Sequence, residues 1–474
     1  MYNTKEPKKI KIREDTMKQL LGNKKFYKSV LLLAIPIMIQ NGITNLLSLA
    51  DNIMIGRVGT EQMSGVAIVN QLMFVFNITI FGVISGAGIF GAQFWGEDNQ
   101  EGIRHTFRFK VIVSTFTTIL AILIFLGFRT QLISAYLKGS GDVGNVEETL
   151  KYGKQFLFIM LVGLFPYAIS QTYASTLREG GRTLPPMVAS IIAVALNCIL
   201  NYIFIFGKLG IPVLGVRGAA IATVISRFVE CLIISIWTHC NSETNPFIKG
   251  AYHSLYMPKS LVKNIAIKGT PLIVNEFLWS AGMATLMQCY SIRGLSVVAG
   301  MNISNTINNV FNIVFIALGN SIAIMVGQLL GAEEFEEAKT TAYKLMFFSF
   351  MSCVGVAVVM TIVAPFFPEL YNTSSQIKEL AKEFIVVAAV CMPLQALSHA
   401  TYFTLRSGGK TVITFIFDSF FVWAVSIPMV YVLTRFTGIS IVMVYFICQS
   451  LEAVKCVIGF TLVKKGVWIQ KIVD

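Results

Sequence analysis

The sequence predicts an all-α integral membrane protein with twelve transmembrane helices, arranged as two six-helix lobes that repeat each other in parallel orientation. Three observations support this fold class: the composition, the length of the apolar stretches and an internal repeat. Of the 474 residues, 55% are hydrophobic and only 13% are charged, and the mean hydropathy is +0.68. Soluble globular proteins carry about 25% charged residues. The composition therefore excludes a soluble protein.

Twelve apolar stretches are long enough to cross a bilayer as helices, and each is bounded by glycine, proline or charged residues. About 20 apolar residues are needed to span the hydrocarbon core, whereas strands of membrane barrels show alternating segments of about ten residues. Helices are therefore expected throughout. The predicted spans are 29–53, 63–90, 109–128, 152–176, 184–206, 215–238, 265–290, 296–329, 342–366, 382–405, 411–434 and 440–463.

The charged residues sort to one side of these spans. With both ends of the chain on the same side, 25 Lys and Arg residues fall on that side and 11 on the other, while Arg227 and Lys455 lie within spans. Basic residues concentrate in cytoplasmic loops. The basic tail 1–28, the linker 240–264 and the tail 464–474 are therefore predicted to be cytoplasmic. The net charge of +13 follows from this topology, and nucleic-acid binding is not expected.

The two halves of the chain resemble each other in sequence. A shift of 235 positions places Gly65-Val66-Ala67-Ile68 on Gly300-Met301-Asn302-Ile303, and a shift of 228 places residues 177–183 on residues 405–411. Since each half holds six helices, both halves cross the membrane in the same direction. Transporters built from such repeats bind substrate between the halves. The predicted lobes are 29–239 and 265–463, and the first shift also pairs Gln93 with Gln328 and Gly96 with Gly331.

The remaining residue types give no sign of an enzyme, a metal site or a channel. Seven of the eight cysteines lie within apolar runs, and the four histidines have no ligand spacing. Neither a CxxC motif nor a Cys/His cluster is present, so a thiolate metal site is not expected. No His- or Asp-rich catalytic cluster and no short pore-loop segment interrupts the spans. We expect no cofactor and no enzymatic activity.

Polar residues inside the first lobe converge at one depth. Asp51 lies six residues before Arg57, Asn201 lies seven before Lys208, and Thr223 lies six after Arg217, all counted from predicted external boundaries. One helical turn from Asn201, on the same helix face, lies Asn197. A carboxylate among amide and hydroxyl oxygens suits a proton or Na⁺, because hard cations prefer oxygen ligands. Alternatively, Asp51 ends its helix at the interface and the asparagines join helices.

The second lobe contains two acidic residues at a common depth. Glu276 lies eight residues after Lys268, and Asp418 lies eight residues after Lys410. Two carboxylates in a dry cavity would titrate as a coupled pair, which suits a proton relay or recognition of a cationic substrate. Alternatively, each is hydrogen-bonded separately within its own bundle. Ionisable residues inside a membrane are functional candidates by default.

Two further pairs of embedded charges have a structural interpretation. Arg227 and Glu230 are three residues apart on one predicted helix, as are Glu452 and Lys455 on another. Opposite charges at this spacing neutralise each other along a helix face. We therefore predict structural ion pairs at both places.

These features together resemble the multidrug and toxic compound extrusion (MATE) family. The resemblance covers residues 29–463 and rests on the repeat, the twelve spans and the order of the motifs. The motifs are Ala34-Ile35-Pro36 leading into Ala50-Asp51-Asn52-Ile53-Met54-Ile55-Gly56, Pro271 followed by Asn275-Glu276, and the paired Leu-Arg-x-Gly-Gly-Arg/Lys-Thr loops at 177–183 and 405–411.

The resemblance implies a secondary-active exporter in which two six-helix lobes rock around a central cavity. An inward gradient of H⁺ or Na⁺ would drive export of amphipathic, often cationic compounds. By the family pattern, Asp51 would be the cation-coupling carboxylate of the first lobe, with Asn197, Asn201 and Thr223 as its neighbours. Glu276 would be the acid of the second lobe.

Two departures from the family pattern leave the coupling ion open. Asn201 stands where many members carry Asp, which removes one charge and weakens the case for a complete Na⁺ site in the first lobe. Some members also carry an acid in the tenth helix, where this chain has Met392-Pro393-Leu394-Gln395. Asp418, in the eleventh helix, is the candidate to take over that role.

We therefore predict a monomeric antiporter of a bacterial plasma membrane, with both termini cytoplasmic, that exports amphipathic drugs or toxic metabolites in exchange for H⁺ or Na⁺. Its partners would be the lipid bilayer and small amphipathic molecules. The competing hypothesis is a flippase for lipid-linked sugars on the related fold. Extra helices, or several basic residues lining a cavity that holds a diphosphate, would favour the flippase. The embedded charges of this chain are mainly acidic, which favours a cationic substrate.

Overall fold

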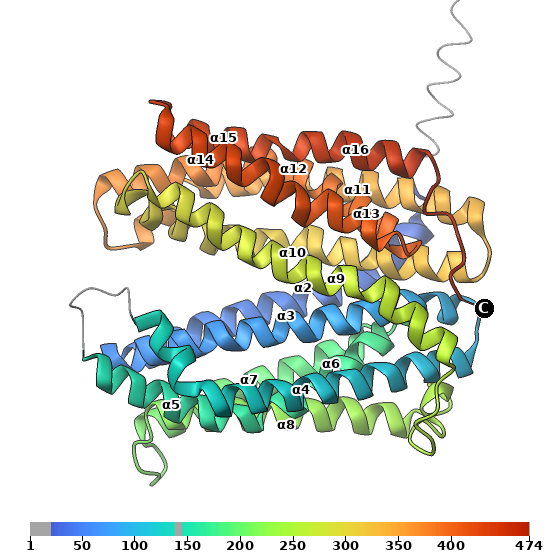
Figure 1. Cartoon of the computed structure of the whole chain (residues 1–474), viewed down its shortest axis with the longest axis horizontal. Coiled ribbons are helices and arrows are strands. Elements are labelled where there is room, and N and C mark those ends of the chain that lie inside the picture. The colour runs from blue at the N-terminus through green and yellow to red at the C-terminus, as the bar shows by residue number, and fades with distance from the viewer. Residues whose placement is uncertain (1–19, 138–144, 474) are drawn as a thin grey trace, which may run out of the picture. The chain divides into compact units, whose positions relative to one another are not determined.

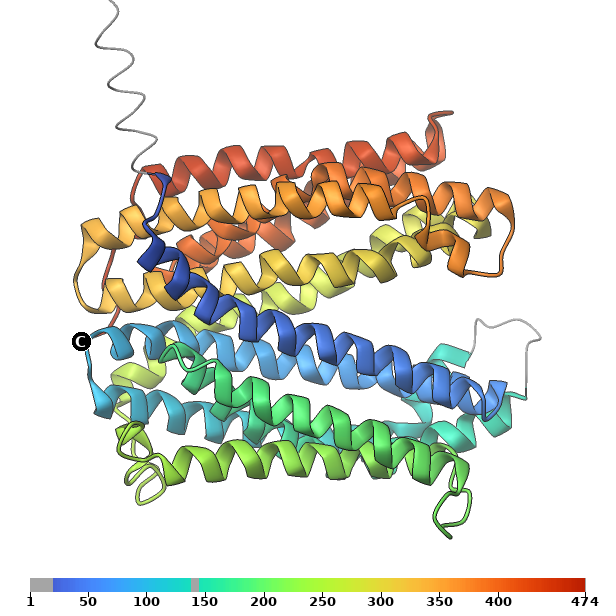
Figure 2. The same ribbon diagram turned by 180° about the vertical axis from the view of Figure 1, so that it is seen from behind.

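A computed structural model describes residues 20–137 and 145–473 of the chain. Figures 1 and 2 show these residues as a set of long helices, and no strand occurs among them. The predicted all-helical membrane fold is confirmed. Most of the predicted basic tail 1–28, namely residues 1–19, lies outside the described part of the chain.

The described residues of the first half form seven helices, which correspond to the first six predicted spans. The fourth span is divided at Gly163, where α5 and α6 meet at a bend of 47°. The Asn145 side chain accepts hydrogen bonds from the backbone N–H groups of Glu147 and Glu148 and so caps the start of α5,. The helices are α2 (Lys24–Gly56), α3 (Thr60–Gly96), α4 (Gln100–Leu137), α5 (Val146–Val162), α6 (Leu164–Glu179), α7 (Leu184–Phe206) and α8 (Val216–Cys240).

The second half follows the same order after a linker that includes the short 3₁₀ helix η1 (Pro246–Ile248). Its eleventh span combines two α-helices with two π-helical turns, an uncommon geometry that is frequent at functional sites. The helices are α9 (Lys259–Ser291), α10 (Leu295–Gly331), α11 (Phe335–Val363), η2 (Phe367–Leu370), α12 (Ser375–Ser407), α13 (Thr411–Phe415), η3 (Ile416–Phe420), η4 (Val422–Ser426), α14 (Ile427–Phe436), α15 (Ile441–Ser450) and α16 (Glu452–Lys464).

The described helices account for the predicted number of membrane spans. By length and composition, ten of them can cross a membrane, and the bent pair α5–α6 adds an eleventh. The 33-residue helix α9 coincides with the seventh predicted span. It is not among these eleven, and it includes the charged residues Lys259, Lys263, Lys268 and Glu276.

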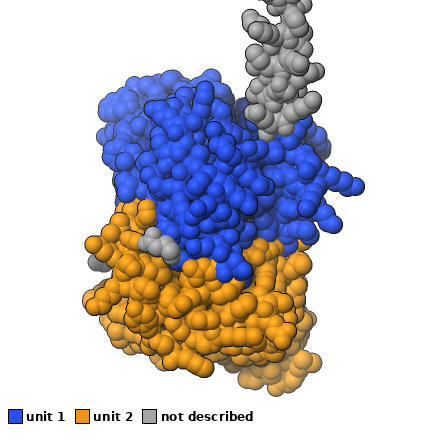
Figure 3. Space-filling model, turned by 90° about the vertical axis from the view of Figure 1, so that its right-hand side faces the viewer, with its two compact units in different colours: residues 1–38, 92–98, 278–474 blue, residues 39–91, 99–277 orange. Residues whose placement is uncertain are grey.

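The chain forms two compact units, which Figure 3 shows in different colours. Of the described residues, 20–38, 92–98 and 278–473 form unit 1, and 39–91, 99–137 and 145–277 form unit 2. The predicted lobes share most residues with these units. The N-terminal part of α2 and the C-terminal end of α3 belong to unit 1, however, and the first part of α9 belongs to unit 2.

Each unit has its own apolar core. In unit 2, Val69, Ile80, Leu164 and Ala220 are fully buried and connect α3, α6 and α8. The cores of unit 1 gather fully buried residues from α10, α11 and α12 and from the segment after α16. Burial of such side chains stabilises the fold by roughly 1.5–3 kcal/mol each.

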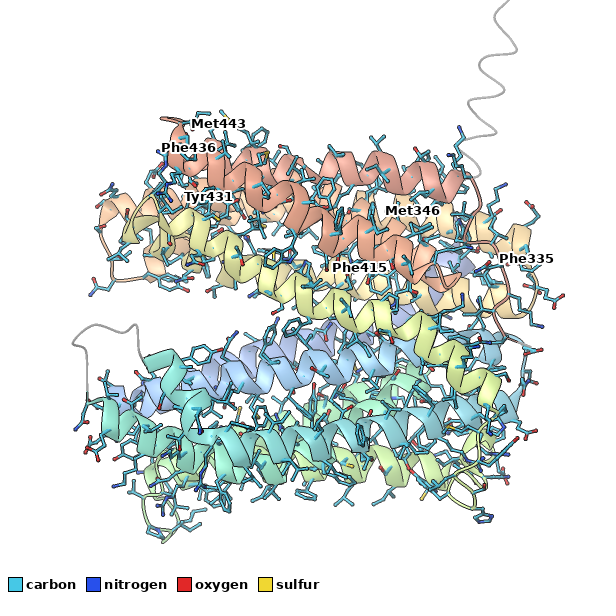
Figure 4. All side chains as sticks on the ribbon, viewed as in Figure 1. Phe335, Met346, Phe415, Tyr431, Phe436 and Met443 are labelled. Atoms are coloured by element: carbon cyan, nitrogen blue, oxygen red, sulfur yellow. The ribbon has the colours of Figure 1, made fainter. Side chains whose placement is uncertain are left out.

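Large apolar side chains also cover much of the surface of unit 1. Phe436 is 70% exposed and Met443 is 50% exposed, and both lie where α14 gives way to α15 (Figure 4). The nearby Tyr431 ring lies 6.3 Å from that of Phe436. Soluble proteins rarely expose large contiguous apolar patches. This surface is consistent with contact to lipid.

Candidate functional site

The four polar residues that the sequence places at one depth of the first lobe do lie together, in unit 2. Asp51 lies near the end of α2, Asn197 and Asn201 lie on α7, and Thr223 lies on α8. The Asn201 Nδ2 atom donates to Asp51 Oδ1 at 2.6 Å and to Asn197 Oδ1 at 2.8 Å. Three helices therefore contribute polar groups to one cluster.

The local sequence explains how α7 presents both amides. Asn197 and Asn201 are four residues apart, so they lie on the same helix face. Both are buried, with relative exposures of 2% and 1%. The Asn197 Nδ2 atom lies 3.3 Å from Thr223 Oγ1, and the Thr223 hydroxyl in turn donates to the Ala219 carbonyl at 3.0 Å. The hydroxyl is thus held at the edge of the cluster by its own helix.

One amide oxygen near the carboxylate lacks a hydrogen-bond donor. Asn201 Oδ1 is buried and has no hydrogen-bond partner among the described residues. With the Asn197 amide turned over, its nitrogen lies 3.2 Å from Asp51 Oδ1 and its oxygen accepts from the Thr223 backbone N–H at 3.2 Å. Such amide orientations are assigned from hydrogen bonding. A buried oxygen without a donor, next to a carboxylate, offers a ligand to a cation.

This cluster combines one negative charge with neutral oxygen donors. The hydrogen bond given above comes from an amide, which stabilises the Asp51 carboxylate without neutralising it. Carboxylate, amide and hydroxyl oxygens are ligands that hard cations prefer. Groups of three or more His, Cys, Asp or Glu side chains that could hold a metal do not occur in residues 20–137 and 145–473.

Asp418 lies on the π-helical turn η3 in unit 1, in a different electrostatic setting. Its Oδ1 atom lies 3.6 Å from the Lys455 ammonium, which also contacts Glu452 at 3.0 Å. Lys455 is 5% exposed and its ammonium lies 5.5 Å from the centre of the Phe421 ring. The predicted Glu452–Lys455 ion pair is confirmed. Its ammonium additionally serves Asp418, which a pairing rule within one helix does not reveal.

Glu276 and Asp418 belong to different compact units. Glu276 lies on the part of α9 that clusters with unit 2, next to the buried Asn275, and Asp418 lies in unit 1. Whether they share a site stays a prediction.

Arg227, which the sequence pairs with Glu230, also contacts residues of another helix and of the bend before it. The Arg227 guanidinium donates to the Gly163 carbonyl at 3.3 Å and lies 5.0 Å from the centre of the Tyr167 ring. The long side chain therefore reaches the bend between α5 and α6. Stacking on an aromatic ring and hydrogen bonding to a carbonyl are both favourable for a guanidinium.

One buried ion pair escaped the sequence prediction. Lys110 belongs to the 25 basic residues assigned to the cytoplasmic side, at the start of the predicted span 109–128. It lies inside α4 and is 0% exposed. Its ammonium contacts Glu179 Oε1 at 2.5 Å and lies 3.2 Å from Thr176 Oγ1. Glu179 also accepts from Ser175 at 2.6 Å. The only signal in the sequence was an acid at the variable position of the Leu-Arg-x-Gly-Gly loop.

Comparison with known proteins now identifies the family. The family model described as MatE matches residues 36–203 and 271–432, one match in each half of the chain. The chain belongs to the MatE family. It is accordingly a multi-pass membrane transporter and not an enzyme, as the sequence predicts.

Individual relatives and structures agree with this membership. The chain is 26% identical over 411 residues to a probable multidrug resistance protein NorM of Thermotoga maritima, covering 86% of each chain. It is 23% identical over 438 residues to a probable multidrug resistance protein YoeA of Bacillus subtilis, covering 91% of this chain and 92% of that one. A solved outward-facing multidrug resistance MATE family transporter matches with a TM-score of 0.83 at 21% identity, covering 95% of this chain and 97% of that one.

Proposed function

We propose that this MatE-family transporter is a cation-coupled antiporter that exports amphipathic, mainly cationic drugs or toxic metabolites by alternating access. The observation that carries the proposal is the cluster of Asp51, Asn197, Asn201 and Thr223. The names of the relatives, probable multidrug resistance proteins, support the class of substrate. The coupling cation is H⁺ or Na⁺. The protein is located in a bacterial plasma membrane.

The cluster suits coupling because the Asp51 carboxylate is hydrogen-bonded by a neutral amide. A charge inside a membrane protein is expensive unless it is paired, so the empty cluster favours uptake of a proton or Na⁺. Coupling requires that cation and substrate prefer different conformations, since a ligand with equal affinity for two states shifts neither. Asp51 lies on α2, whose N-terminal part belongs to unit 1 while Asp51 itself belongs to unit 2. A cation bound here can therefore bias the position of a helix that both units include.

The acids Glu276 and Asp418 are proposed as sites for substrate or a second cation. For Asp418, the Lys455 ammonium already provides a counter-charge. A cationic substrate that used Asp418 would have to displace Lys455. We propose Glu276, the acid that the family resemblance assigns to the second lobe, for substrate recognition.

The test is driven transport of ethidium, a lipophilic fluorescent cation, in proteoliposomes. Vesicles with an imposed proton gradient or an imposed Na⁺ gradient form separate arms, so that the active arm identifies the coupling ion. We expect wild type to move ethidium in one arm and Asp51→Asn to lose that gradient-driven movement. Glu276→Gln should lower ethidium transport without abolishing its response to the gradient.

Glu148→Gln is the matched control, because Glu148 is an exposed carboxylate in the first turn of α5. It should transport like wild type, and all variants should elute from a sizing column as folded protein. Gradient-driven movement by Asp51→Asn at the wild-type rate would overturn the assignment of this site.

A further inference from the structure

The repeated Gln-x-x-Gly motif forms a close helix crossing in unit 1. Gln93 and Gly96 near the end of α3 meet Gln328 and Gly331 near the end of α10. A methyl group at Gly96 would collide with the backbone of Gln328, and one at Gly331 would collide with the backbone of Gln93. Each motif thus supplies the glycine that the other needs. The residues that the internal repeat pairs in sequence are also paired in space.

A segment after α16, residues 466–473, covers this crossing, and we call it the strap. It starts at Gly466, whose φ of +70° turns the chain away from the helix,. Trp468 is fully buried and donates to the Val463 carbonyl at 3.1 Å. A methyl group at Gly408 would collide with the backbone of Trp468. The first part of the strap is therefore fixed in the core of unit 1 by apolar burial.

The second part of the strap makes polar contacts with the end of α3. The Ile472 backbone N–H donates to Gln93 Oε1 at 2.7 Å, and Gln93 Nε2 donates to the Gln470 carbonyl at 3.4 Å. The Lys471 ammonium contacts Glu97 at 3.1 Å and Glu333, in the turn after α10, at 2.9 Å. Gln93 is fully buried, whereas the side chains of Lys471 and Glu97 are 23% and 27% exposed. Water can therefore replace the Lys471–Glu97 ion pair at little cost.

The end of α3 is a place where the chain passes between the two units. Residues 60–91 of α3 cluster with unit 2, residues 92–98 cluster with unit 1, and the chain returns to unit 2 at Asn99. Any movement of one unit against the other must either bend the chain at these two junctions or detach residues 92–98 from unit 1. The polar half of the strap decides between these outcomes, because it binds Gln93 and Glu97 directly.

We propose that residues 470–472 form a latch on Gln93 and Glu97, anchored by Trp468, and that this latch opens in each transport cycle. The buried tryptophan keeps the strap on unit 1, while the polar bonds of residues 470–472 open and release the end of α3. The latch stabilises the conformation described here and so shifts the population between the two states of the transporter. This inference rests on the proposed alternating-access function.

Lys471 allows a matched test, because it contacts one acid on α3 and one acid in the α10–α11 turn. The first variant carries Glu97→Cys with Lys471→Cys, and the second carries Glu333→Cys with Lys471→Cys. Both also carry Cys240→Ser, because Cys240 is exposed. Each is treated with a short bifunctional thiol reagent that forms reducible disulfides. Ethidium transport is then measured in proteoliposomes before and after reduction.

The latch predicts that linking residues 97 and 471 abolishes gradient-driven transport and that reduction restores it. Linking residues 333 and 471 should leave transport intact, because both residues stay on unit 1. Transport by the 97–471 linked protein at the rate of its reduced form would overturn the proposal. Loss of transport in both linked proteins would contradict the claim that the strap stays anchored on unit 1 during transport. If wild type moves no ethidium in either gradient, the proposed function fails, and the latch fails with it.

Hydrogen exchange of the Ile472 amide gives a second measurement that needs no cysteine substitution. The exchange of this amide should accelerate when wild-type vesicles are supplied with ethidium and the active gradient. Exchange that stays as slow during turnover as at rest would contradict an opening latch, because the bond to Gln93 would then be permanent.

Discussion

Asp51 in unit 2 and Asp418 in unit 1 are both acids within predicted spans, but their surroundings differ in one decisive respect. Asp51 accepts a hydrogen bond from the neutral amide of Asn201, whereas Asp418 lies 3.6 Å from the ammonium of Lys455. The first carboxylate retains a charge that a mobile cation can neutralise. The second has a counter-charge that is part of the chain. We infer from this difference that Asp51 is the better coupling candidate of the two acids.

Glu179 extends the comparison to a fully buried pair. Its carboxylate contacts the ammonium of Lys110, with side-chain exposures of 8% and 0%. Gly88 and Gly91 of α3 lie so close to this carboxylate that a methyl group at either would collide with it. Neither charge can reach water, so Lys110 and Glu179 depend on each other. The pair is a structural connection between α4 and α6, packed against α3.

The largest effect on stability is expected for Lys110→Met. Removing one partner of a buried ion pair leaves an unpaired charge, which costs about 3–5 kcal/mol in the free energy of unfolding. Thermal unfolding in detergent measures this loss. Combining Lys110→Met with Glu179→Met should recover most of it, since a buried pair replaced by apolar residues is often neutral. A single variant as stable as wild type would show that the pair is not a structural connection.

A smaller loss is expected for Lys455→Met, because its acidic partners Asp418 and Glu452 are partly exposed, at 24% and 21%. The variant should lose about 2 kcal/mol of unfolding free energy, below the range for fully buried pairs. It should also gain a dependence of its melting temperature on Na⁺ relative to choline, because Asp418 then lacks its tethered cation. Lys455→Arg is the control that keeps the charge. A melting temperature insensitive to the substitution would remove the distinction between Asp51 and Asp418.

The smallest effect on stability is expected for Lys471, the most exposed of these three lysines. Hydrogen bonds to Glu333 and Glu97 raise the pKa of Lys471 above its ordinary value of 10.5. A raised pKa means that the folded state holds the proton more tightly, so the stabilisation is complete below 10.5 and is lost as the pH rises through the raised pKa.

Limited proteolysis of the strap across the alkaline range measures this dependence. Wild type should become more susceptible to cleavage as Lys471 loses its proton. Lys471→Gln should be cleaved more readily than wild type below that transition, and its susceptibility should not change with pH there. Equal protection of wild type and Lys471→Gln at neutral pH would show that these ion pairs do not hold the strap.

The sequence predicted the fold and one cluster well because both depend on local patterns. Apolar length and charge asymmetry determine spans, and counting from basic boundaries placed Asp51, Asn201 and Thr223 at one depth. The partner of Asp418 was not predicted, because Lys455 already had an acid three residues away that satisfied the helix-spacing rule. The Lys110–Glu179 pair joins residues 69 positions apart, and no periodicity within one helix carries that information.

The boundaries of the two compact units could not be predicted from the sequence, because they depend on tertiary packing. The repeat correctly pairs Gln93 with Gln328 and Gly96 with Gly331, but it does not show that these residues cross each other. That crossing places residues 92–98 in unit 1, although the rest of α3 belongs to unit 2. A repeat shows which residues are equivalent. Their contacts follow only from the structure.

We propose that the neutral surroundings of Asp51, unlike those of Asp418, make it the coupling carboxylate. The most direct test compares gradient-driven ethidium efflux of wild type, Asp51→Asn and Asp418→Asn in the same proteoliposome preparation, with the active ion gradient imposed or dissipated. We predict that Asp51→Asn shows the same efflux with and without the gradient, whereas Asp418→Asn still responds to it. A response to the gradient that survives in Asp51→Asn, or is lost only in Asp418→Asn, would contradict the account.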